Sequence, residues 1–148
     1  MKKLLTLILI ASTTIAVNAQ STSEEDAVKK ACMNYLEGFY EGDTTKLKAA
    51  LVPKLYKIGY WKANGEVQHK FSNQMTYTAA IDYALDVKAK KQFAPASAPK
   101  EVKIFEVSEH IAAAKVTAWW GIDYLLLSKE HGTWMIEEVI WEGPLKKN

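Results

Sequence analysis

Two carboxylates near the C-terminus, Asp123 and Glu138, interrupt runs of apolar residues and could act as a general acid and base. The pair His131-Gly132 between these runs is typical of a two-residue hairpin turn, in which Glu130 pairs with Thr133. In this register Asp123 and Glu138 become diagonal neighbours on one sheet face, about 7–8 Å apart at Cα. The predicted members of that face are Asp123, Leu125, Leu127, Trp134, Ile136, Glu138 and Ile140.

The surroundings of that face decide what the two carboxylates could do. If it lines a pocket, desolvation and mutual repulsion raise the pKa of at least one carboxyl group, as acid–base catalysis requires. The alternative is structural: one carboxylate faces solvent, or pairs with a Lys or with an amide at a strand end. The register sets Leu125 opposite Glu138 and Asp123 opposite Ile140, and a slip of one residue would move Asp123 or Glu138 to the opposite face.

Three helices and several strands are predicted to position this face. Ser23-Glu24-Glu25-Asp26 begins a helix that reaches about Tyr40, Asp43 caps a short helix ended by Pro53, and Ser72 caps a helix to about Lys90. Strands are predicted over residues 54–61, 66–70, 102–109, 111–120, 122–128 and 134–142, with Asn64-Gly65 as the first hairpin turn. Short connections favour antiparallel pairing. The expected fold is therefore α+β, with a curved sheet wrapping the helices and a pocket between them.

The N-terminus is typical of a secretory signal peptide. Met1-Lys2-Lys3 is a short positive segment, an apolar run follows from Leu4 to Val17, and Val17-Asn18-Ala19 offers the small residues that signal peptidase cleaves after. A retained membrane anchor is the competing interpretation. We expect a signal peptide at residues 1–19 and a single domain at residues 20–148, exported to the periplasm or beyond the cell and free of the membrane after cleavage.

The charge balance argues against several classes of partner. The chain has 19 basic and 17 acidic residues, and all of the basic residues are Lys. Loss of Lys2 and Lys3 with the signal makes the mature chain formally neutral, and without Arg it lacks the forks that read phosphate and guanine. Nucleic acid is therefore not an expected partner. His69, His110 and His131 lie in separate segments without metal-ligand spacing, so neither a metal nor another cofactor is expected.

Two adjacent tryptophans, Trp119 and Trp120, bear on the oligomeric state. They end a predicted strand, so alternation would send one of them to the face away from the helices. Partial exposure at a strand end is one interpretation. A contact between two copies through the outer sheet face is the other, and we expect a homodimer.

Three segments resemble a known family. Asp123-Tyr124-Leu125-Leu126-Leu127-Ser128-Lys129, followed by Gly132, Trp134 and Ile136, resembles the closing hairpin of the putative lumazine-binding family. Tyr35-Leu36-Glu37-Gly38-Phe39-Tyr40-Glu41-Gly42-Asp43 resembles its first helix, and Ala112-Ala113-Ala114-Lys115-Val116 resembles the entry to its penultimate strands. The resemblance runs from about Glu24 to Trp141. It implies the cone-shaped α+β fold of the nuclear transport factor 2-like superfamily, with three N-terminal helices and a hairpin packed on a curved antiparallel sheet.

The resemblance leaves the function open, because that superfamily hosts isomerases, dehydratases, cyclases and non-catalytic binders. The first hypothesis is an exported, non-catalytic binder of a small apolar or aromatic molecule, with Asp123 and Glu138 as polar anchors. Its pocket would be lined by Tyr35, Phe39, Tyr56, Leu125, Trp134 and Ile136. The alternative is an isomerase- or dehydratase-like enzyme with a pocket carboxylate as base and, by similarity to ketosteroid isomerase, Tyr35 or Tyr56 as donor. In a third interpretation side chains fill the pocket and the role is dimeric scaffolding.

Overall fold

The structure is a computed structural model that describes the backbone of residues 2–145 and the side chains of residues 22–145. The helices are α1 (Lys2–Glu41), α2 (Thr44–Ala50) and α3 (Tyr77–Lys90). The strands are β1 (Leu51–Trp61), β2 (Lys70–Met75), β3 (Glu101–Val107), β4 (Ile111–Ala118), β5 (Gly121–Glu130) and β6 (Thr133–Gly143). The expected signal peptide, residues 1–19, lies outside the part of the chain whose side chains are described.

The helices form where the sequence supplies an apolar stripe and a cap. The apolar stripe of α1 is buried, and it includes Cys32, Tyr35 and Phe39. Asp43 caps α2 as expected, because its Oδ1 accepts hydrogen bonds from the backbone N–H groups of Thr45 and Lys46. Three helix boundaries were wrong. α2 ends at Ala50, and Pro53, predicted to end it, lies within β1. The residue predicted to start the first helix, Ser23, lies inside α1, and α3 is capped by Thr76 rather than Ser72 because β2 occupies residues 70–75.

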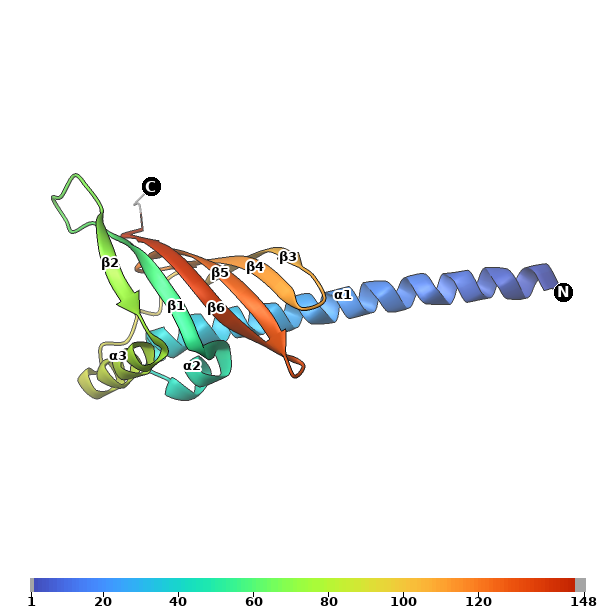
Figure 1. Ribbon diagram of the computed structural model, residues 1–148, viewed down its shortest axis with the longest axis horizontal. Coiled ribbons are helices and arrows are strands. Elements are labelled where there is room, and N and C mark those ends of the chain that lie inside the picture. Colours follow the sequence, from blue (N-terminus) through green and yellow to red (C-terminus); the bar gives the residue numbers. More distant parts are fainter. Residues whose placement is uncertain (1, 146–148) are drawn as a thin grey trace.

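All six strands belong to one sheet, in the order β2-β1-β6-β5-β4-β3 (Figure 1). Every neighbouring pair is antiparallel except β1 and β6, which are parallel. The antiparallel pairing expected from the short connections between the later strands is confirmed, whereas the parallel pairing of β1 with β6 was not predicted. At the centre of the sheet the last strand pairs with the first and joins the early hairpin to the later meander. The Asn64-Gly65 turn is present, but the first strand pair, Trp61 with Lys70, lies several residues away from it. The strand predicted over residues 66–70 is therefore displaced to Lys70–Met75.

A β-bulge changes the register of the last hairpin. Glu130 pairs with Thr133 and Leu127 with Ile136, as predicted. The register then shifts, so that Leu126 lies opposite Glu138, Leu125 opposite Val139 and Asp123 opposite Trp141. Glu137 is the extra residue in β6, and such an insertion reverses the facing of every residue beyond it. The pairs predicted for Leu125 with Glu138 and for Asp123 with Ile140 are therefore wrong.

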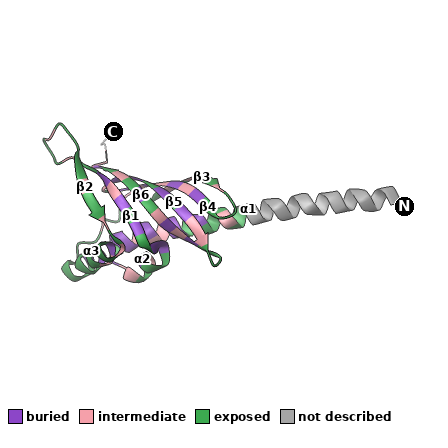
Figure 2. Cartoon of the chain, in the orientation of Figure 1, coloured by how far each residue is buried: buried purple, intermediate pink, exposed green. Residues whose placement is uncertain are grey.

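The helices cover one face of the sheet, and the core lies between them (Figure 2). α1 packs on β3, β4 and β6, while α3 packs on β1. The inner face carries fully or almost fully buried side chains such as Leu125, Ile136 and Val139. Burial of each such side chain stabilises the fold by about 1.5–3 kcal/mol. Among the residues described, no helix has both the length and the apolar character needed to cross a bilayer.

Candidate functional site

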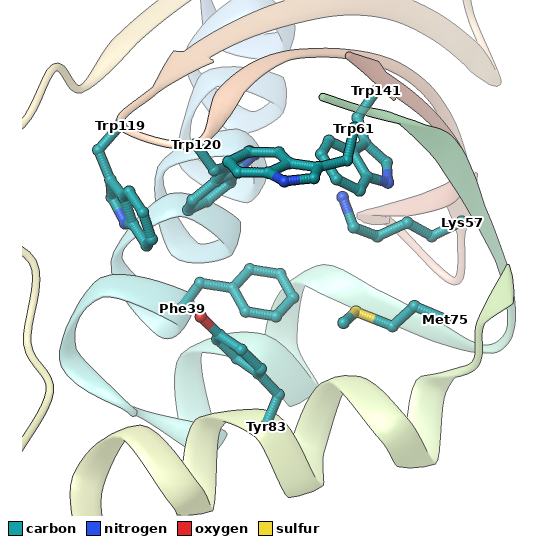
Figure 3. A pocket seen from close by; sticks show the side chains of 8 residues that line it. All are labelled: Phe39, Lys57, Trp61, Met75, Tyr83, Trp119, Trp120 and Trp141. Carbon is teal, nitrogen blue, oxygen red and sulfur yellow. The ribbon is translucent and has the colours of Figure 1, made fainter. Parts of the chain in front are cut away.

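A cavity of about 170 Å³ opens between the inner sheet face and the helices (Figure 3). Its lining is aromatic except for one thioether and one amine. The lining residues are Phe39, Lys57, Trp61, Met75, Tyr83, Trp119, Trp120 and Trp141. Phe39 and Lys57 are almost fully buried, whereas Trp61, Tyr83 and Trp119 are about two-fifths to one-half exposed and form the rim. We refer to this space as the tryptophan cavity.

The turn between β4 and β5 contributes two indoles to the cavity. Trp119 and Trp120 occupy the turn itself, so both line the cavity and the prediction that they point to opposite sheet faces is wrong. The Tyr40 hydroxyl anchors this turn: it accepts a hydrogen bond from the Trp119 backbone N–H at 2.9 Å and donates to the Pro99 carbonyl at 2.6 Å. The Tyr40 ring also meets Trp120 edge to face at 5.5 Å between centroids.

The position of Trp141 depends on a glycine in the neighbouring strand. Gly59 pairs with Trp141 across the parallel β1·β6 ladder. A Cβ added at Gly59 would lie only 2.3 Å from Cδ1 of the Trp141 ring, so the absence of a side chain there leaves room for the indole. Trp61 lies two residues after Gly59, so its side chain is on the same, inner face of β1. Its ring centroid lies 6.1 Å from that of Trp141.

A buried polar network lies beside the cavity and is built around Asp123, which has no exposed surface. The Tyr35 hydroxyl donates a short hydrogen bond to Oδ2 of Asp123. The Lys57 ammonium donates to the same oxygen at 3.0 Å and to the Tyr35 hydroxyl oxygen at 2.8 Å. The Trp120 Nε1–H donates to Oδ1 of Asp123 at 2.7 Å. Asp123 therefore holds three groups from α1, β1 and the β4–β5 turn in fixed positions.

Burial changes the proton affinities of two members of this network. Desolvation, together with the negative charge of Asp123, raises the pKa of Tyr35 well above its ordinary value, so its phenol stays protonated. Desolvation lowers the pKa of Lys57, although the charge of Asp123 and its hydrogen bond act in the opposite direction. The network thus consists of the neutral phenol of Tyr35 and the Asp123 carboxylate, which pairs with the Lys57 ammonium.

The structure brings only part of the predicted pocket together. Phe39 lines the tryptophan cavity, and Tyr35 and Asp123 form the polar network directly behind it. Leu125, Trp134 and Ile136 are buried in the core, outside the set that lines the cavity. These three residues support the inner face rather than contact its opening.

Two predicted site residues lie on the opposite side of the sheet. Glu138 is exposed, because the bulge at Glu137 turns it to the outer face, and it borders a different hollow together with Glu106 and Leu126. Tyr56 pairs with Glu138 and is also exposed, because it has the opposite parity to Leu55 and Lys57 on β1. The expectation that Asp123 and Glu138 share a pocket face is therefore wrong.

Of the eight residues that line the cavity, only Phe39 was predicted, and Lys57 is the charged residue among the seven that sequence reasoning missed. Side chains along a strand point alternately to its two faces, so Lys57 lies on the same face as Leu55 and on the opposite face from Tyr56 and Ile58. An inward-facing lysine was therefore detectable in the sequence. The position of Trp141 was not detectable in the same way, because it depends on the bulge. Within residues 22–145, no group of three or more His, Cys, Asp or Glu side chains could hold a metal ion.

Comparisons with known proteins agree with this architecture. A profile of the family described as putative lumazine-binding matches residues 23–142. A nuclear transport factor 2-like protein of unknown function from Shewanella baltica has 20% identity and a TM-score of 0.63, over 81% of this chain and 93% of its own. One from Silicibacter pomeroyi has 23% identity and a TM-score of 0.57, over 81% and 96%. These structures share the fold. Among curated proteins, no match was found.

Proposed function

Because this chain belongs to the putative lumazine-binding family, with a nuclear transport factor 2-like α+β fold, we propose that it is an exported, non-catalytic small-molecule-binding protein. Its ligand is small and apolar or aromatic. The tryptophan cavity is the observation that carries this proposal. Four indoles, a phenyl ring and a phenol surround a space large enough for an aromatic ring, because an apolar cavity of about 150 Å³ holds benzene.

The polar network supports binding over catalysis. A general base needs an oxygen that is free to take a proton from the substrate. Both oxygens of Asp123 already accept hydrogen bonds, from Tyr35, Lys57 and Trp120, and Asp123 is absent from the cavity lining. The second proposed carboxylate, Glu138, lies on the outer face. The isomerase or dehydratase alternative therefore loses the acid–base pair on which it was based.

Indole signals provide a direct test of binding. Four of the five tryptophans line the cavity, whereas Trp134 donates its Nε1–H to Glu24 elsewhere. In protein labelled with ¹⁵N-tryptophan, titration with a panel of benzene derivatives should shift the indole resonances of Trp61, Trp119, Trp120 and Trp141. The Trp134 resonance serves as the internal control. If no compound in the panel shifts the four cavity signals, the binding proposal is wrong.

A matched pair of substitutions locates the binding site. Met75→Phe adds volume to the cavity wall, whereas Leu126→Phe adds similar volume on the exposed outer face. The Met75→Phe variant should bind the same compounds at least several-fold more weakly, and the Leu126→Phe variant should bind them as the wild type does. Equal weakening in both variants would place the ligand elsewhere.

The export part of the proposal rests on residues 1–19 and has its own test. The full-length chain, produced in a bacterial host, should be recovered outside the cytoplasm with the mass of a chain that begins at Gln20. Ala19→Leu removes the small residue before the cleavage site and should leave the uncleaved precursor. Recovery of the wild-type chain with residues 1–19 still attached would contradict export by signal cleavage.

We also propose that the protein is a homodimer whose copies meet through the outer sheet face. Exposed apolar side chains gather there on neighbouring strands β1, β6 and β5, and Phe105 from β3 stacks on Tyr124. We define the outer patch as Tyr56, Phe105, Tyr124, Leu126 and Ile140, each about half exposed. Such a patch is typical of an interface, and because a two-fold interface is self-complementary, one patch can cover another.

Sedimentation velocity tests the dimer. Leu126→Glu places a charge in the outer patch and should yield monomers. The control, Val67→Glu, makes the same type of change at a loop residue that is 90% exposed, and should leave the dimer intact. A wild-type protein that sediments as a monomer at micromolar concentration would overturn this proposal.

A further inference from the structure

We propose that Lys57 is the recognition group of the tryptophan cavity, and that the ligand is a neutral, planar aromatic compound with a carbonyl oxygen that accepts a hydrogen bond from it. This inference rests on the proposed binding function and names the chemical class of the ligand. It assigns the polar contact to Lys57 rather than to Asp123 or Glu138.

The first argument is the direction of the lysine side chain. Lys57 extends from β1 so that its amino group points into the cavity, toward the tryptophan rings (Figure 3). Its Nζ lies 5.3 Å from the centroid of the Trp141 ring and 5.5 Å from that of Tyr35. Among the eight lining side chains, it is the one that carries a full charge. A polar ligand atom that passes the rim therefore meets a single charged group, Lys57.

The second argument is the count of hydrogen-bond donors. An ammonium group has three N–H donors and no acceptor. Within the described part of the chain, Lys57 uses two of them, toward the Tyr35 hydroxyl and Oδ2 of Asp123. The third finds no oxygen or nitrogen acceptor among the described residues, and the ammonium otherwise faces only the rings of Trp141 and Tyr35. A contact with a ring is weaker than a hydrogen bond to a carbonyl oxygen. A ligand oxygen would satisfy this third donor.

The third argument is the charge balance, which selects a neutral ligand. Asp123 already neutralises the ammonium at 3.0 Å and is fully buried. A carboxylate or phenolate ligand would leave a net negative charge in a site walled by aromatic rings, and burial of an unbalanced charge is costly. A carbonyl oxygen accepts the free N–H without adding charge.

The size and shape of the cavity complete the assignment. About 170 Å³ accommodates one aromatic ring with a small substituent, and a larger molecule would extend past Trp61 and Trp119 at the rim. Indole side chains around the space favour a flat ring, because aromatic pairs stack or meet edge to face.

Three probes of similar size separate the possibilities: acetophenone, ethylbenzene and benzoate. At pH 6 and fixed salt, their dissociation constants follow from the shifts of the four cavity indoles in ¹⁵N-tryptophan-labelled protein. Acetophenone should bind about tenfold more tightly than ethylbenzene, because about 1.4 kcal/mol from one hydrogen bond to a charged donor corresponds to that ratio. Benzoate should bind more weakly than acetophenone.

Variants then assign the preference to Lys57. Lys57→Met keeps the length of the side chain and should remove the advantage of acetophenone over ethylbenzene. Lys57→Met combined with Asp123→Asn tests the same point without a carboxylate that lacks its cation. Lys54→Met, on the same strand and with a side chain 69% exposed, is the matched control and should keep the wild-type ratio. The Trp134 resonance reports that each variant is folded.

The outcomes separate this inference from the proposal on which it rests. If acetophenone and ethylbenzene both bind the wild type with equal affinity, the cavity binds aromatic molecules but Lys57 does not select among them. If benzoate binds most tightly, the ligand is an anion and the charge argument is wrong. If none of the three shifts the cavity indoles, the binding function itself is in question. The wild-type comparison decides even if both Lys57 variants fail to fold.

Discussion

The Lys57 ammonium and the Asp123 carboxylate form an ion pair of 3.0 Å inside the protein, with side chains 8% and 0% exposed. Tyr35 bridges the pair, because it accepts from Lys57 and donates to Asp123. Ionisable side chains are rarely buried this completely unless they are paired. Here the ammonium and the carboxylate are each other's partner. The pair ties β1 to β5, two strands that are separated in the sheet by β6.

Removal of one partner from this pair should be strongly destabilising. Asp123→Asn leaves the buried Lys57 ammonium without its counter-charge, and we expect the free energy of unfolding to fall by about 3–5 kcal/mol. The double variant with Lys57→Met should lose less than the sum of the two single variants, because the two sites interact. Urea unfolding followed by circular dichroism measures each value. Glu138→Gln, on the exposed outer face, should change stability by less than about 0.5 kcal/mol; a similar loss there would show that Asp123 is not special.

Glu24 should titrate below its ordinary range. Hydrogen bonds from Lys129 and Trp134 lower its pKa from 4.5. Because the folded-state pKa lies below the unfolded one, the contribution of Glu24 to stability is complete above about pH 4.5 and is lost as pH falls through the lowered value. The Trp134 indole proton, followed by NMR from pH 7 to pH 2, reports this titration. Glu24→Gln should abolish the transition and Glu25→Gln should leave it in place; a midpoint at or above 4.5 would contradict the prediction.

Cys32 should be inert in the folded protein. Burial in the apolar stripe of α1 raises the pKa of its thiol from 9.0 to about 12. At pH 8 the thiolate is therefore scarce as well as inaccessible. A chromogenic disulfide reagent should leave Cys32 unmodified in native buffer and label it completely in concentrated urea. Rapid labelling of the native protein would show that α1 opens readily from the sheet.

Gly59→Ala should disturb the cavity although Gly59 is not one of its lining residues. The new Cβ would lie 2.3 Å from Cδ1 of Trp141, so the indole must move, and overpacking of this kind costs about 1–3 kcal/mol. We expect a lower melting temperature and a displaced Trp141 indole resonance. Gly132→Ala is the control: its Cβ meets nothing within 4 Å, although φ of +79° strains the backbone. That variant should lose stability while the Trp141 resonance stays unchanged.

The sequence carried the local features of the fold well. Asp43 was recognised as a helix cap, and His131-Gly132 marked the turn that starts the last hairpin. These features depend on neighbouring residues, so their physical causes are visible in a single sequence. The family resemblance, carried by the last hairpin and the first helix, was also confirmed.

The parts of the site that were missed depend on distant contacts. The parallel pairing of β1 with β6 joins residues about eighty positions apart, and nothing local specifies it. Lys57 becomes a site residue only because that pairing brings β1 beside β6 and places it within 3.0 Å of Asp123. Placing Glu138 in the pocket failed for a smaller reason, the extra residue at Glu137, which no periodicity in β6 announces.

The bulge at Glu137 determines whether Trp141 lies on the cavity side of the sheet or on the solvent side. Along β5 the side chains alternate between the two sheet faces without interruption. In β6 this alternation shifts by one residue at the bulge, and beyond the shift Trp141 lies on the inner side. One indole of the cavity thus depends on the number of residues that precede it in the strand, and not only on its own identity. A relative with a tryptophan at the same distance along β6 but without the bulge would present it to the solvent side. Alignments of this family therefore have to be gapped at the bulge before their cavities can be compared.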